Sequence, residues 1–132
     1  MRKGLFKLVL TGVLLGLAPA VTWMASGAQA RDLAPSAVTD VALSSLPEQG
    51  RETYRLIHQG GPFPYEKDGT VFGNRERLLP GQKRGFYREY TVRTPDSKDR
   101  GARRIVCGGA ATKPEICYYT ANHYASFSRI VP

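Results

Sequence analysis

The sequence predicts an α+β fold in which one N-terminal helix packs on a small antiparallel β-sheet. A single convincing helical segment lies between about Ser45 and Gly60. It is followed by a run of short strands separated by short turns, without internal repeats or low-complexity tracts. One helix followed by closely spaced strands is typical of α+β domains with an antiparallel sheet.

The first thirty residues are interpreted as a secretory signal peptide. Their start is basic, with Arg2, Lys3 and Lys7. Leu8 to Val21 is almost wholly apolar, and Ala28-Gln29-Ala30 offers small residues at the positions that a signal peptidase reads. A membrane anchor is the competing interpretation, but charges follow quickly and no later segment is apolar enough to span. We therefore expect a secreted, extracellular mature protein with no membrane association.

The remaining chain is expected to form a flexible tail over residues 31–39 and one domain over residues 40–132. All eleven acidic residues follow Ala30, but only sixteen of the nineteen basic ones do, so the net charge changes from +8 to +5 on cleavage. A basic secreted protein could meet nucleic acid, an anionic cell surface or acidic polysaccharide. Charge alone does not choose among these partners.

The helix has recognisable end signals. Ser45 is the expected N-cap, and Pro47 lies in the first turn, where its missing N–H costs little. Gly60-Gly61 supplies the stop. His58 falls in the last turn, where a histidine favours the negative end of the helix dipole, so we interpret it as structural rather than catalytic.

The strongest strand signal is Gly85 to Val92, which is rich in aromatic and β-branched residues. Because side chains alternate along a strand, Phe86, Arg88, Tyr90 and Val92 should share one face and Tyr87, Glu89, Thr91 and Arg93 the other. Further extended segments are expected at Thr70–Phe72, Arg103–Cys107, Cys117–Thr120 and Ala125–Val131.

Glu89 is unusual because it lies in the middle of this strand with aromatic residues on both sides. Taken alone, it would be a solvated acid on the open face of the sheet. Arg100, Arg104 and His123 follow within a few dozen residues, however. A carboxylate, a histidine and arginines on one face form an acid–base pair with a cationic cradle, which favours a phosphoryl-transfer site. Arg103 alternates with Arg104 and should be an exposed charge on the opposite face.

Cys107 and Cys117 are the two cysteines, and export to an oxidising compartment makes a disulfide the expected state. They flank a Gly/Ala/Pro turn, so the bond would join the two strands of one hairpin. The closed loop of eleven residues would be worth about 2.8 kcal/mol in the chain-entropy estimate. A metal site is disfavoured because two cysteines lack the further ligands that zinc needs.

Five blocks, in order, resemble the guanyl-specific microbial ribonucleases, the bacterial branch that includes the Streptomyces enzymes and, more distantly, barnase. The resemblance extends from about Val41 to Ile130. The blocks are Gly61–Tyr65, Val71–Glu76, Tyr87–Val92, Arg100–Ile105 and Asn122–Phe127.

This resemblance implies a catalytic role for residues on one sheet face. By family position, Glu89 is the general base and His123 the general acid. Arg100 and Arg104 form the phosphate clamp, and Tyr124 is a neighbouring phosphate contact. No metal or other cofactor is implied. The alternative for His123 is a capping or packing histidine.

The same resemblance places guanine recognition in the loop from Phe72 to Glu76. Phe72 would stack on the base, and backbone N–H groups near Asn74 and Arg75 would meet O6. The carboxylate of Glu76 offers two acceptors for the guanine N1–H and N2 amino group. Without the resemblance, Glu76 would be an exposed acid paired with Arg75 or Arg77.

Two features depart from the family pattern. Gly73 stands where a longer polar residue is expected. The family also ties a residue near the start of the domain to the C-terminus, whereas Ala42 and the short Val131-Pro132 end offer no such pair, so the family disulfide is not carried over.

The function implied is that of a secreted, metal-independent, monomeric endoribonuclease that cleaves single-stranded RNA 3′ to guanosine. The product would be a 2′,3′-cyclic phosphate, hydrolysed afterwards to a 3′-phosphate. A barstar-like protein inhibitor is a partner that kinship alone suggests. The alternative is a non-catalytic cationic protein that binds nucleic acid or anionic surfaces, but pure binding needs no acid in the cleft.

Overall fold

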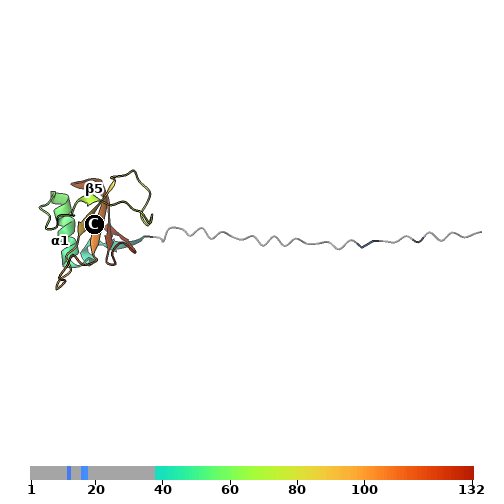
Figure 1. Cartoon of the computed structure of the whole chain (residues 1–132), viewed down its shortest axis with the longest axis horizontal. Coiled ribbons are helices and arrows are strands. Elements are labelled where there is room, and N and C mark those ends of the chain that lie inside the picture. The colour runs from blue at the N-terminus through green and yellow to red at the C-terminus, as the bar shows by residue number, and fades with distance from the viewer. Residues whose placement is uncertain (1–11, 13–15, 18–37) are drawn as a thin grey trace, which may run out of the picture. The chain divides into compact units, whose positions relative to one another are not determined.

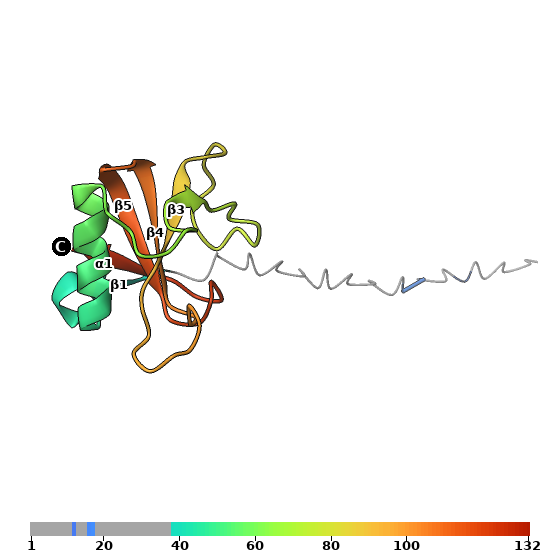
Figure 2. The same ribbon diagram turned by 60° about the vertical axis from the view of Figure 1, so that its left-hand side comes forward.

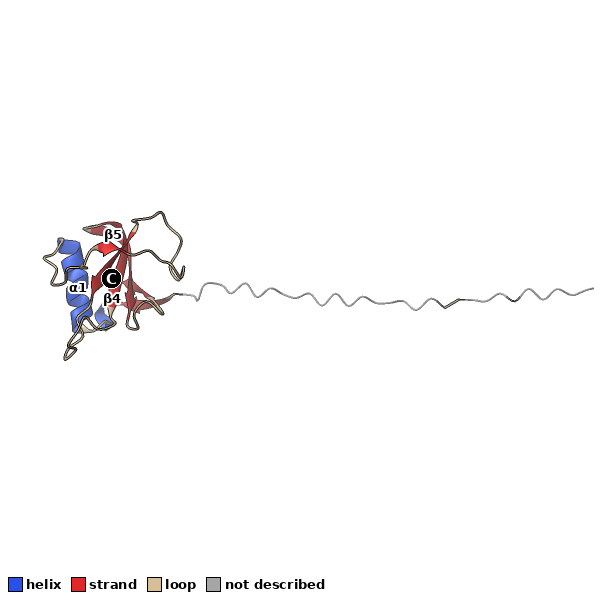
Figure 3. Ribbon diagram, in the orientation of Figure 1, coloured by secondary structure: helices blue, strands red, loops and turns tan. Residues whose placement is uncertain are grey.

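The structure is a computed structural model that describes residues 38–132 together with residues 12, 16 and 17. Within residues 38–132, one α-helix covers one face of a six-stranded sheet, which confirms the predicted α+β class (Figures 1 and 3). Apart from the three isolated positions, the predicted signal peptide and the predicted tail up to residue 37 lie outside the described residues. No described helix is both long and apolar enough to cross a membrane.

The strands lie side by side in the order β1-β6-β5-β4-β3-β2. All neighbours are antiparallel except β1 and β6, which run parallel. Their bounds are β1 Thr39–Ala42, β2 Thr70–Val71, β3 Tyr87–Thr91, β4 Arg104–Ala110, β5 Lys113–Thr120 and β6 Ser128–Val131.

The sequence analysis does not predict β1. Three of its four residues are exposed, so it has no apolar alternation to reveal it. Thr39, the last residue of the predicted tail, begins this strand and pairs with Ser128 of β6. The pairing therefore depends on a partner at the far end of the chain.

The helix α1 spans Glu48–Gln59, and Pro47 rather than Ser45 is its N-cap residue. The predicted Ser45 cap is wrong because Ser45 ends a 3-10 helix, η1 (Leu43–Ser45), and the extended Leu46 that follows is buried in the core. The predicted stop is confirmed: Gly60 adopts the left-handed conformation, with φ 78°. His58 closes the last turn, with Nδ1 2.9 Å from the Tyr54 carbonyl oxygen.

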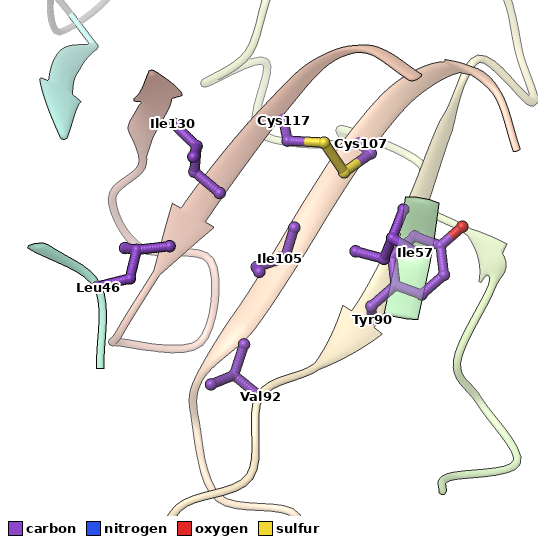
Figure 4. Close-up of a cluster of buried hydrophobic side chains, with 8 residues drawn as sticks. All are labelled: Leu46, Ile57, Tyr90, Val92, Ile105, Cys107, Cys117 and Ile130. Carbon is purple, nitrogen blue, oxygen red and sulfur yellow. A yellow bond between two sulfur atoms is a disulfide. The ribbon is translucent and has the colours of Figure 1, made fainter. Parts of the chain in front are cut away.

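The main core lies between α1 and the sheet (Figure 4). Ile57 of the helix packs over Tyr90, Val92 and Ile105, which come from β3, the residue after it, and β4. A hydrogen bond fixes the helix on the sheet, since Thr53 Oγ1 donates to the Thr91 carbonyl oxygen at 3.2 Å. The helix therefore holds the backbone of the strand that carries Glu89.

A second apolar cluster lies on the opposite face of the sheet, where Tyr87, Val106 and Tyr118 pack under Leu79 and Phe127. Tyr90 faces the helix and Tyr87 faces away from it, as the alternation predicts. The predicted face of Phe86 is wrong: Phe86 precedes the first residue of β3, so the alternation does not extend to it, and its ring packs with Tyr87 on the face away from the helix. In Figure 2, the yellow loop leading into β3 rises beyond one end of that strand, and the orange loop after β3 extends beyond the other. The face between them stays free of helix.

The predicted disulfide is confirmed. Cys107 of β4 and Cys117 of β5 are directly opposite in the strand register and are bonded, with their Cα atoms 4.1 Å apart. Both cysteines belong to the core on the helix side (Figure 4).

Replacing both cysteines by alanine should lower the free energy of unfolding by about 3 kcal/mol, because the bond closes a short loop in the unfolded chain. Urea denaturation measures this change. Catalytic activity of the folded variant should stay near that of the parent, because the cysteines lie on the face opposite Glu89. An unchanged unfolding midpoint would contradict a stabilising role.

Candidate active site

Glu89 occupies the middle of β3 on the face away from the helix, and its side chain is only 16% exposed. Both carboxylate oxygens have a partner. The Tyr124 hydroxyl donates to Oε2 at 2.7 Å, and Arg100 Nη2 lies 3.5 Å from Oε1. The carboxylate of Glu89 is thus held by a cation at one oxygen and by a hydroxyl donor at the other.

Arg100 is held from below by a threonine. Its Nε and Nη2 both donate to Thr91 Oγ1, at 3.1 and 2.8 Å. Thr91 is buried, and its own backbone N–H donates to Asp68 Oδ1 at 2.7 Å. The two hydrogen bonds to Thr91 therefore fix the guanidinium of Arg100 beside Glu89, even though Arg100 comes from a loop.

Arg104 is buried, with 3% of its surface exposed, although it carries a positive charge. Its Nη1 donates to three carbonyl oxygens of its own loop, those of Arg100, Gly101 and Arg103. Its Nε has no hydrogen-bond partner, and none of the described acids forms an ion pair with it. A buried cation without an anion is costly, so an anionic ligand at this position would be stabilised.

His123 lies at the tip of a tight loop after β5. It is exposed, and both His123 and Tyr124 adopt left-handed backbone angles, with φ 54° and 69°. The His123 backbone N–H donates to the Ala102 carbonyl oxygen at 2.9 Å, which joins this loop to the arginine loop. Non-glycine residues with positive φ are uncommon and need support from their surroundings.

That support comes from three polar side chains. Thr120 Oγ1 donates to Asn122 Oδ1 at 2.9 Å and accepts the Tyr124 backbone N–H at 3.2 Å. Asn122 Oδ1 also accepts the Ser126 N–H at 3.0 Å, and Asn122 Nδ2 donates to Ser126 Oγ at 2.8 Å. These bonds fold residues 120–126 so that His123 and Tyr124 point toward the site. The sequence analysis does not identify Thr120, Asn122 or Thr91, because small polar residues carry no distinctive pattern.

Burial raises the pKa of Tyr124 to about 12, and its hydrogen bond to Glu89 adds to the shift. The hydroxyl therefore stays protonated at neutral pH and can remain a donor. The positive charge of Arg104 acts in the opposite direction and lowers the pKa of the Tyr124 hydroxyl.

One pocket of about 350 Å³ brings together most of the residues that the sequence predicts for catalysis and base recognition. Its wall is formed by the loop Phe72–Glu76 with Leu78, and the opposite side by Glu89, His123, Tyr124 and Phe127. Arg100 and Arg104 do not line it; Arg100 reaches it through its contact with Glu89. The Phe72 ring lies 5.0 Å from that of Tyr124 and 5.9 Å from that of Phe127, so one end of the pocket is aromatic.

The loop of the pocket is held by Asn74. Its Nδ2 donates to the Leu79 carbonyl oxygen at 2.9 Å, and its Oδ1 accepts the Leu79 N–H at 3.2 Å. The Asn74 side chain is thus engaged within the protein, so its contact with a ligand would be through the backbone. Glu76 is exposed and forms no ion pair with Arg75 or Arg77 in the part of the chain described.

Arg103 is half-buried rather than exposed, which corrects the expectation of a free surface charge. It lies on the other face from Arg104, as predicted: its charge acts on Tyr119, which packs against the helix-side core. The described residues contain no group of three or more histidine, cysteine or acidic side chains that could hold a metal ion.

Comparison with known proteins gives a consistent result. The family model for ribonuclease matches residues 29–131. The chain is 55% identical over 94 residues to guanyl-specific ribonuclease Sa3 of Kitasatospora aureofaciens, covering 71% of this chain but only 64% of that protein. It is 52% identical over 90 residues to guanyl-specific ribonuclease Sa of the same organism, covering 68% of this chain and 91% of the relative.

Solved structures agree. Ribonuclease Sa2, described in complexes with mononucleotides, superposes with a TM-score of 0.68 at 47% identity, covering 73% of this chain and 96% of that chain. Another structure of ribonuclease Sa2, with 3′-GMP, gives a TM-score of 0.64 at 44% identity, over 72% of this chain and 98% of the other.

Replacing Thr120 by valine should lower the cleavage rate about tenfold without unfolding the chain. The change keeps the shape of the side chain but leaves the Tyr124 N–H without an acceptor, which typically costs about 1–3 kcal/mol. Turnover of RNA and circular dichroism measure the two effects. Thr39→Val, an exposed substitution on β1, is the control and should be silent. Equal activity in both variants would show that the 120–126 network does not position His123.

Proposed function

Because the chain belongs to the ribonuclease family and is 52% and 55% identical to the guanyl-specific ribonucleases Sa and Sa3, we propose that it is a guanyl-specific endoribonuclease. Its substrate is single-stranded RNA, which it cleaves on the 3′ side of guanosine. The observation that carries this proposal is the single pocket in which Glu89 and His123 lie against the loop that ends at Glu76. A base bound by that loop would place its 3′-phosphate beside the acid–base pair.

Glu89 acts as the general base in this proposal. It removes the proton from the ribose 2′-OH, whose oxygen then attacks phosphorus. His123, protonated, delivers a proton to the leaving 5′-oxygen, so the bond between phosphorus and that oxygen breaks and a 2′,3′-cyclic phosphate forms. Each proton transfer of this kind typically contributes 10²–10⁴-fold. In the second step the two residues exchange roles. His123 takes a proton from water, whose oxygen attacks the cyclic phosphate, and Glu89 returns a proton to the 2′-oxygen as its bond to phosphorus breaks, which gives the 3′-phosphate.

The arginines stabilise the charge that develops on the phosphate oxygens. Arg104 is suited to this role because its Nε is unpartnered and buried, so an oxygen that reaches it receives a hydrogen bond in a partly dry site. Arg100 is held by Thr91 before substrate arrives, so little reorganisation is needed. Tyr124, with its pKa raised to about 12, remains a neutral donor throughout the working range.

Guanine recognition rests on Glu76 and the loop backbone. The carboxylate of Glu76 can accept hydrogen bonds from both the N1–H and the 2-amino group of guanine. Adenine has neither of these donors. The loop is held in shape by the Asn74–Leu79 bonds, which leaves the backbone N–H groups near Arg75 for O6. Phe72 supports the base by stacking.

A non-catalytic cationic protein is the rival function. Digestion of RNA in excess EDTA separates the two, because the proposed mechanism uses no metal and continues, whereas a binding protein leaves the RNA intact. We further propose that the chain is secreted after removal of residues 1–30 and acts as a monomer. A barstar-like inhibitor in the producing cell rests on kinship alone.

Replacing Glu89 or His123 by alanine should lower kcat/KM by two to four orders of magnitude, because each variant loses one proton transfer. The rate of the parent should follow a bell-shaped pH profile, since Glu89 must be ionised while His123 is protonated. Tyr124→Phe should also lower kcat/KM, because Glu89 loses the hydroxyl that holds one of its carboxylate oxygens.

His58→Ala is the matched control for the histidine, and it should retain nearly full activity because His58 lies at the end of α1, on the other side of the sheet. Comparable loss in the His58 and His123 variants would reject the assignment of the general acid.

Glu76→Ala should reduce cleavage after guanosine steeply and the weak cleavage after adenosine much less, because only guanine supplies the two donors. Inosine keeps N1–H but lacks the 2-amino group, so it should fall between the two for the parent. The gap between guanosine and inosine should narrow in the variant. A variant that keeps its full preference for guanosine would make Glu76 an ordinary surface acid. Cleavage rates on oligoribonucleotides that contain a single guanosine, inosine or adenosine measure these three preferences.

A further inference from the structure

A second, larger groove of about 1270 Å³ lies on the same open face of the sheet as the catalytic pocket. It meets that pocket at Gly73, Asn74 and Leu78, which line both. The loop between β2 and β3 thus forms a rim that the two hollows share. A nucleic-acid strand that leaves one hollow can cross this rim into the other.

The groove has a cationic edge. Arg77, Lys83 and Arg129 line it, and Asp40 is the acid among its lining residues. Asp40 is already neutralised, because Arg129 donates to both of its oxygens at 2.9 and 2.8 Å. Arg77 and Lys83 are exposed and form no ion pair within residues 38–132. Two positive charges therefore remain without an acidic partner.

The floor of the groove is apolar. Tyr118 is buried and packs edge-on to Tyr87 and Phe127, and Ile116 is half-buried beside it. A groove with a positively charged edge and an apolar floor suits a single strand of nucleic acid, whose phosphates would meet the charged edge.

The strand register places this groove on the opposite side of Glu89 from the phosphate clamp. Arg104 on β4 lies across from Thr91 and Thr120, at one end of the open face. Tyr118 lies one row further, level with Glu89, and Ile116 one row beyond. The clamp would take the phosphate 3′ to the bound guanosine, so the 5′ side of that nucleoside is directed toward the groove.

We propose that this groove binds the RNA strand upstream of the cleaved guanosine, with Arg77 and Lys83 contacting its phosphates. This inference rests on the proposed ribonuclease function. The groove wall is fixed in advance, because Tyr87 Oη donates to the Pro80 carbonyl oxygen at 2.7 Å and the Arg77 N–H donates to the Asn74 carbonyl oxygen at 3.0 Å. A preformed wall loses little conformational freedom on binding.

Three synthetic substrates with one guanosine test the proposal: the dinucleotide GpU, the 5′-extended UpUpUpGpU and the 3′-extended GpUpUpUpU. The parent should cleave the 5′-extended substrate with a kcat/KM at least tenfold above that of GpU, mainly through KM. Lys83→Glu should remove most of this gain and leave the rate on GpU within twofold. Its matched control is Lys67→Glu, an exposed lysine outside the groove, which should keep the gain.

Arg77→Asn is a second variant, chosen because Arg77 has a left-handed φ of 54° that asparagine tolerates. It should lower the dependence of KM on salt for the 5′-extended substrate by about 0.7 in the log–log slope, the value for one lost phosphate contact on a single strand.

Two results would overturn the proposal: equal cleavage of GpU and the 5′-extended substrate by the parent, or an effect of Lys83→Glu confined to the 3′-extended one. Failure to cleave GpU at all would instead count against the ribonuclease function itself.

Discussion

The site depends on a carboxylate held between two partners on a face of the sheet where aromatic side chains predominate. The side chain of Glu89 is only 16% exposed and shares one pocket with Tyr124 and Phe127. Arg100 and the Tyr124 hydroxyl contact one carboxylate oxygen each. Both partners are themselves held, Arg100 by Thr91 and Tyr124 by the bonds of Thr120. Much of the fold around the site therefore serves to hold Arg100 and Tyr124 against Glu89.

The two faces of the sheet divide stability from chemistry. On one face, α1, the disulfide and an apolar core fix the backbone of β3 and β4. On the other, the structure retains features that cost stability: Arg104 is buried without an anion, and His123 and Tyr124 have strained backbone angles. Such costs are expected at functional sites and are sustained by the rigid layer behind them. A phosphate bound beside Arg104 would supply an anion to this buried cation and so relieve the first of these costs.

Much of this arrangement could be predicted from the sequence, for identifiable reasons. Period-two alternation from Tyr87 to Val92 places Glu89 on the face opposite to that of the helix-facing Tyr90, and Gly60 marks the end of α1. Features that depend on distant partners could not be predicted. Strand β1 pairs with β6 at the other end of the chain and lacks alternation, and the burial of Leu46 displaces the expected cap from Ser45 to Pro47. Thr91 and Thr120 are ordinary strand threonines until the fold sets them under Arg100 and Tyr124.

The central claim is that Glu89 activates the 2′-OH of the bound guanosine. The most direct test uses an oligoribonucleotide whose single guanosine is replaced by 2′-deoxyguanosine, with every other nucleotide unchanged. The base and the phosphates that bind the protein are retained, so the analogue should compete with the parent RNA at a similar concentration, yet it should not be cut. Mass spectrometry of the products would detect any strand scission. Cleavage of the analogue at the same bond would contradict the account, because the nucleophile would then have to come from elsewhere.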